Sequence, residues 1–135
     1  MKKVFIDSDI ILDALLKRPD FDTEAMNLLA LLYQNTIEGM TSSIAFMNVH
    51  YFLNKFDRPN ALSLLKHVRS IIHLIKTGET EIDLALKSNF SDFEDAVQYY
   101  TAISANADMI ITRNLKDYKQ STIPVLTAGQ FLRTL

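Results

Sequence analysis

Short apolar runs alternate with longer amphipathic segments along the whole chain. The short runs are bounded by turn-forming residues and contain β-branched or other apolar side chains, which is typical of buried strands. They predict strands at residues 3–7, 38–41, 71–75, 109–112 and 124–127. Gly39 is expected to mark a turn close to the second of these strands.

The segments between these runs carry apolar residues three and four positions apart, which is the spacing of one helix face. They predict helices after Asp7 up to Pro19, from Thr23 to Gln34, from Ser42 or Ser43 to Lys55, from Pro59 to residue 71, over 79–89, from Ser91 or Asp92 to Ala105, and over 128–135. In two of them we expect particular residues to face inward: Met26, Leu29, Ala30 and Tyr33 in the second helix, and Ile44, Phe52 and Leu53 in the third.

The alternation of strands and helices predicts the fold class. Right-handed βαβ crossovers place helices on both faces of a sheet whose strands run parallel. We therefore expect an α/β protein, a three-layer α/β/α sandwich with a central, mostly parallel sheet of four or five strands. The 135 residues are the length of one ordinary domain, so residues 1–135 are expected to form a single domain.

Composition narrows the setting and the chemistry. The chain has no cysteine, which excludes disulfides, thiolate catalysis and Cys-based metal sites, and is typical of a reducing compartment such as the cytoplasm. Asp7, Asp9 and Asp13 interrupt the apolar N-terminal stretch, so neither a signal peptide nor a membrane span is expected. The net charge of −2 means that any contact with nucleic acid must depend on local patches.

Three aspartates are expected to meet at one edge of the sheet, because ligand sites in such sheets lie beyond the carboxyl ends of the strands. Asp7 ends the first strand, and Asp117 follows the strand at 109–112. Asp95 lies in the first turn of a helix that runs back towards that edge, on the same helix face as Tyr99. Asp92 is expected to cap that helix. The three carboxylates supply oxygen ligands only, which would suit Mg²⁺ or Mn²⁺.

Other polar residues are candidates for supporting parts at this edge. Asn48 is predicted to face inward from its helix and to complete the cluster by contacting a metal-bound water or a phosphate. Asn114, Arg113, Lys116 and Ser42 are candidate substrate contacts, and Arg113 and Lys116 could steer phosphate towards the acids. Asp13 is expected to lie on the surface.

The segments FID at the end of the first strand, DFEDA at a helix start, and ITRNLKDY after a later strand together resemble a PIN domain of the bacterial toxin type. The resemblance covers the whole chain. It implies a Mg²⁺- or Mn²⁺-dependent ribonuclease, the toxin of a toxin–antitoxin pair, with RNA, an antitoxin and a second copy of the chain as partners. It also implies that Asp7, Asp95 and Asp117 are metal ligands and catalytic residues. We predict Asn48 as a fourth catalytic residue, which positions water or phosphate.

Asn48 departs from the pattern, because such domains usually carry a glutamate at this position. A first alternative is therefore a catalytically degenerate PIN-like module that binds RNA or protein. A second follows from Asp7-Ser8-Asp9, which looks like the DxD motif of phosphatases that form a phosphoaspartate. That enzyme class would need a downstream lysine and a second acidic pair at other strand ends.

Overall fold

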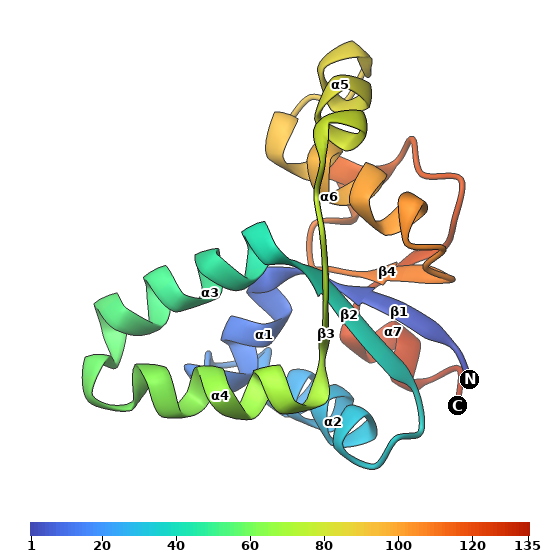
Figure 1. The fold of residues 1–135 in the computed structure, drawn as a ribbon. Helices are drawn as coiled ribbons and strands as arrows, with labels where there is room; N and C mark the ends of the chain where they lie inside the picture. Colours follow the sequence, from blue (N-terminus) through green and yellow to red (C-terminus); the bar gives the residue numbers. More distant parts are fainter.

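The computed structural model describes all 135 residues, and its centre is a five-stranded parallel sheet in the order β3-β2-β1-β4-β5 (Figure 1). The strands are β1 (Lys3–Ile6), β2 (Glu38–Ser42), β3 (His73–Ile75), β4 (Met109–Ile111) and β5 (Val125–Leu126). Strand β1 lies at the centre, where Val4 pairs with Gly39 on one side and with Met109 on the other. The predicted parallel sheet is confirmed.

Seven helices connect the strands: α1 (Ser8–Leu15), α2 (Asp22–Tyr33), α3 (Ser43–Phe56), α4 (Ala61–Ile71), α5 (Glu79–Lys87), α6 (Phe93–Ser104) and α7 (Ala128–Leu132). Two short 3₁₀ turns, η1 (Arg58–Asn60) and η2 (Leu115–Tyr118), complete the chain. Pro59, the predicted first residue of the fourth helix, lies in η1, and α4 begins at Ala61. None of these helices is both long enough and apolar enough to cross a membrane.

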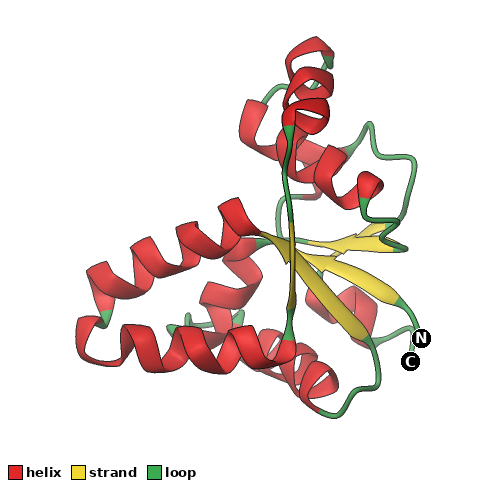
Figure 2. Cartoon of the chain, viewed as in Figure 1, coloured by secondary structure: helices red, strands yellow, loops and turns green.

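The side chains of β1 alternate between two cores. Val4 and Ile6 belong to the larger core, which is shared with α1, α2, α3, α4 and α7, whereas Phe5 points into a smaller core beneath α6. Helix α5 packs on α6, at a distance from the other helices (Figure 2). Helices therefore cover both faces of the sheet, as the alternation along the sequence predicts.

The predicted inward face of α2 is wrong by one position, and that of α3 is wrong at Ile44 but confirmed at Leu53. In α2 the buried residues are Ala25, Leu28 and Leu32, while Met26 and Tyr33 are 51% and 78% exposed. In α3 the buried residues are Ala45, Val49 and Leu53, and Ile44 is 47% exposed. Both helices carry apolar residues on more than one face, so the spacing of apolar residues alone could not show which face is buried.

Two residues predicted at boundaries between elements also lie inside elements in the structure. Helix α2 begins at Asp22, one residue before the predicted start at Thr23, and no side chain caps it. Gly39 lies inside β2, and the turn falls earlier, at Asn35, whose φ of 57° is in the left-handed region. A Cβ at Gly39 would lie 2.5 Å from Leu32 Cδ2, so glycine at this position allows α2 to approach the sheet.

We expect Gly39→Ala to lower the free energy of unfolding by about 1 to 3 kcal/mol, because the added methyl group overpacks the contact with α2. Urea unfolding of the purified protein measures this change. Combining it with Leu32→Val should recover part of the loss, because the shorter side chain makes room. If the double variant is destabilised by the sum of the two single effects, the contact at Leu32 does not explain the glycine.

Candidate active site

The strand order reverses beside β1, since β2 and β3 lie on one side of it and β4 and β5 on the other. In open parallel sheets the crevice at such a reversal, beyond the carboxyl ends of the strands, is where ligands bind. Asp7 lies at this point. Its backbone N–H donates to Ile111 O at 3.0 Å, and its side chain caps α1 by accepting from Ser8 N at 2.7 Å.

Asp7 is a buried carboxylate, with only 8% of its surface exposed. Its second oxygen accepts a hydrogen bond from Thr112 Oγ1 at 2.8 Å. Burial and, after it, the charge of Asp9 raise the pKa of Asp7, the hydrogen bonds from Thr112 and Ser8 oppose the rise, and the result is a pKa of about 7. Near neutral pH this carboxyl group is therefore only partly ionised, and a nearby cation would favour its ionised form.

Asp95 lies in the first turn of α6, where Asp92 caps the helix by accepting from Asp95 N at 2.9 Å. The predicted cap is confirmed. Partial burial, followed by the charges of Asp92, Asp7 and Asp117 in that order, raises the pKa of Asp95 to about 7. Of the three aspartates singled out in the sequence, Asp7 and Asp117 are therefore both close enough to Asp95 to raise its pKa.

A cleft of about 490 Å³ opens on this edge between α3 and the start of α6. Polar residues Asp7, Ser8, Asn48, Glu94, Asp95 and Gln98 line it. Its apolar wall comes from both helices and includes Ile44, Met47, Tyr51 and Phe93, each more than 40% exposed. Asp117 does not line this cleft, and it borders a separate depression with Lys116 and Lys119.

Asn48 is exposed, so the prediction that it faces inward is wrong. Its Nδ2 atom donates to Ser8 Oγ at 3.2 Å, which places the amide one residue from Asp7 at the mouth of the cleft. The inward face of α3 carries Ala45 and Val49 instead. Asn48 is therefore near the acids, as expected, but is accessible to a ligand.

Ser42, predicted as a substrate contact, has a structural role. Its side chain is fully buried, caps α3 by accepting from Ala45 N at 2.9 Å, and donates to Gln98 Oε1 at 2.6 Å. It cannot reach a substrate, which corrects the predicted contact. Gln98, which sequence reasoning missed, lines the cleft from α6. Its position three residues after Asp95, on the same helix face, was the available signal.

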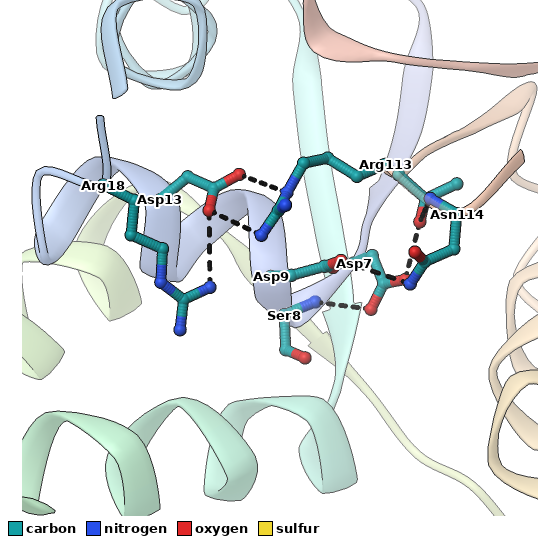
Figure 3. Close-up of polar contacts among 8 residues, drawn as sticks. Asp7, Ser8, Asp9, Asp13, Arg18, Arg113 and Asn114 are labelled. Atoms are coloured by element: carbon teal, nitrogen blue, oxygen red, sulfur yellow. Dashed lines mark hydrogen bonds and ion pairs between the residues drawn. The ribbon is translucent and has the colours of Figure 1, made fainter. Parts of the chain in front are cut away.

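Arg113 is not placed to contact a substrate as predicted, because its guanidinium points to Asp13 on α1 (Figure 3). Asp13 is 1% exposed, so the prediction of a surface residue is wrong. Asn114 lies beside the acids as expected, and its Nδ2 atom donates to Asp9 Oδ2 at 3.4 Å. Lys116 is exposed in η2.

The acidic site suits a divalent cation bound by oxygen atoms. Asp9 Oδ1 and Tyr118 Oη are buried without hydrogen-bond partners, and burial followed by the charges of Asp7 and Asp95 raises the pKa of Tyr118. No three acidic or histidine side chains are arranged to complete a metal site on their own. Asp7 and Asp95 could hold a divalent cation that binds through one or two carboxylates and keeps several waters.

Comparison with known proteins is consistent with this geometry. Residues 3–116 match the PIN domain family. Ribonuclease VapC1 of Aquifex aeolicus (strain VF5) is 32% identical over 135 residues, which covers 96% of this chain and 93% of the relative. The fold is similar to that of a chain of VapBC2 from Rickettsia felis bound to a promoter DNA fragment, with a TM-score of 0.68 and 24% identity over 92% of this chain and 96% of that one. It is also similar to a chain of a toxin–antitoxin complex from Klebsiella pneumoniae, with a TM-score of 0.65 and 23% identity over 93% of this chain and 97% of that one.

The raised pKa of Asp7 predicts how the metal-free protein responds to pH. Between the ordinary pKa of 3.8 and the raised value of about 7, the folded state holds a proton that the unfolded state has lost. The free energy of unfolding in EDTA should therefore fall as pH rises through this range and level off above it. Asp95 acts in the same direction.

Asp7→Asn should remove much of this slope. At neutral pH the metal-free variant should be more stable than the wild type, by on the order of 2 to 4 kcal/mol, because one pKa unit corresponds to about 1.4 kcal/mol. Urea unfolding at several pH values measures this, with Asp83→Asn on the exposed face of α5 as the control. A wild type that is the more stable of the two at neutral pH would contradict the raised pKa.

Proposed function

The chain belongs to the PIN domain family, and on that basis we propose that it is a metal-dependent endoribonuclease that hydrolyses RNA phosphodiester bonds. The observation that carries the proposal is the pair Asp7 and Asp95, which face one cleft at the reversal of the sheet with their pKa values raised to about 7. Carboxylates crowded in this way are held for a cation, since nothing else in the fold neutralises Asp95.

Asp7 and Asp95 would hold Mg²⁺ or Mn²⁺, and Asp117 would support it from the side of η2. When bound, such an ion lowers the pKa of a bound water and neutralises charge on the departing oxygen. Thr112 keeps Asp7 in one orientation through its 2.8 Å hydrogen bond. The amides of Asn48 on α3 and Gln98 on α6 line the cleft, where they can donate to phosphate oxygens or to waters.

We also propose that the protein is a toxin neutralised by an antitoxin. The support is its 32% identity to a VapC ribonuclease and the apolar rim of the cleft, which exposes Met47 and Tyr51 by 63% and 60%. Exposed apolar surface beside an active site is typical of a site that a protein partner covers. A homodimer and a cytoplasmic location remain expectations from the sequence. Family membership leaves the phosphatase alternative without support.

Asp7→Asn and Asp95→Asn should each reduce Mn²⁺-dependent cleavage of a fluorescently labelled RNA by at least about a hundredfold, because each removes a charge that the metal requires. Asp83→Asn, on the exposed face of α5, should cleave at the wild-type rate. Wild-type cleavage by both site variants would remove Asp7 and Asp95 from the mechanism.

Asn48→Glu tests the alternative of a degenerate module. The added carboxylate would extend into the cleft beside Ser8 and Asp7, and we expect it to tighten Mn²⁺ binding roughly tenfold in calorimetry. Asn48→Gln is the control, because it lengthens the side chain without adding charge. If the wild type neither binds Mn²⁺ nor cleaves RNA and Asn48→Glu does both, the degenerate module is the correct interpretation.

A further inference from the structure

The three consecutive residues that follow β4 each bind a different acid at the start of the chain. Thr112 Oγ1 donates to Asp7 Oδ2 at 2.8 Å, and Asn114 Nδ2 donates to Asp9 Oδ2 at 3.4 Å. Between them, Arg113 forms an ion pair with Asp13, with Nε 2.9 Å from Oδ2 and a hydrogen bond from its second terminal nitrogen to Oδ1 at 3.1 Å. The loop 112–114 is thus attached to β1 and α1 at three points.

The geometry explains why the three contacts occur together. Asp9 and Asp13 are four residues apart on α1, so they lie on one helix face, and the loop runs along that face (Figure 3). The loop is also closed internally, because Asn114 N donates to Thr112 Oγ1 at 3.1 Å. A shift of Arg113 along α1 would therefore move both residues that hold Asp7 and Asp9.

In the middle contact the carboxylate is buried, whereas the side chain of Arg113 is 31% exposed. Asp13 is 1% exposed, and Arg18 lies 3.3 Å from it as a second cation. The guanidinium of Arg113 also lies over the ring of Phe21, with 4.1 Å between Cζ and the centroid. A guanidinium held by a carboxylate at two points and by an aromatic ring is fixed in place, so it is not free to contact a substrate phosphate.

We propose that Asp13 and Arg113 are positioning residues, whose ion pair holds the loop 112–114 so that Thr112 and Asn114 keep Asp7 and Asp9 in the arrangement that receives the metal. Their effect on cleavage rests on the proposed ribonuclease function. The pair itself does not contact RNA. This assigns a functional part to a buried carboxylate that lies one turn beyond the acidic cluster.

Asp13→Asn, Arg113→Gln and their double variant provide the first test. Each single variant should weaken Mn²⁺ binding in calorimetry about tenfold or more, the range found for groups that orient metal ligands. Each should also lower kcat for RNA cleavage while leaving KM unchanged. The double variant should resemble the single ones, because either change alone breaks the pair. Arg113→Lys should rescue little, since an ammonium cannot make the paired contact.

Arg18→Gln is the matched control, because Arg18 also contacts Asp13 but does not belong to the loop 112–114. It should retain wild-type Mn²⁺ affinity and kcat. If Arg113 instead contacted a phosphate, Arg113→Gln would raise KM and lower the salt dependence of RNA binding by about one unit of slope, whereas Asp13→Asn would not. Either that result or wild-type Mn²⁺ affinity in both single variants would overturn the proposal.

Two further measurements keep the test independent of folding and of catalysis. If a single variant does not fold, Asp13→Leu with Arg113→Met removes both charges and leaves none buried and unpaired, and it should fold but bind Mn²⁺ weakly. Hydrogen exchange of the Asn114 backbone N–H, which needs neither metal nor RNA, should accelerate in Arg113→Gln and not in Arg18→Gln. Unchanged exchange in Arg113→Gln overturns the proposal, whereas a wild type that cleaves no RNA overturns the proposed function alone.

Discussion

The burial of one carboxylate, that of Asp7, is the constraint on which the rest of the site depends. A charge at the end of a buried strand loses hydration, and three features of the fold offset part of that loss: the start of α1, the N–H of Ser8 and the hydroxyl of Thr112. They do not offset it fully, since the pKa of Asp7 is raised to about 7. The metal-free site is therefore electrostatically unfavourable, and a divalent cation would relieve it.

The site is asymmetric in how charge is compensated. On the side of α1, the buried carboxylate of Asp13 is compensated by two cations, Arg113 and Arg18. On the side of α6, Asp95 is only half-buried and is surrounded by other carboxylates. These ion pairs beside the open acidic site hold the loop that follows β4 against α1 while the acids lie close together.

Two uncharged amides line the cleft beside the acids. Asn48 and Gln98 present amides where a glutamate is usual at the first position, and Ser42 holds Gln98 from beneath. With fewer carboxylates the site carries less negative charge, so it repels RNA less and holds a metal less tightly. The amides can donate hydrogen bonds to phosphate oxygens, which a carboxylate cannot do.

The amino-acid sequence by itself determined the alternation of strands and helices, the parallel sheet, and the placement of Asp7 and Asp95 at its edge. These features follow from local periodicity and from the direction in which a helix must return to the next strand. Only the tertiary structure decided which faces of α2 and α3 are buried, because apolar residues on several faces allow more than one phase. It also decided that Asn48 is exposed and that Asp13 is buried, paired with an arginine 100 residues away. Such a partner comes close only when β4 lies beside β1, so no local pattern in the sequence could reveal it.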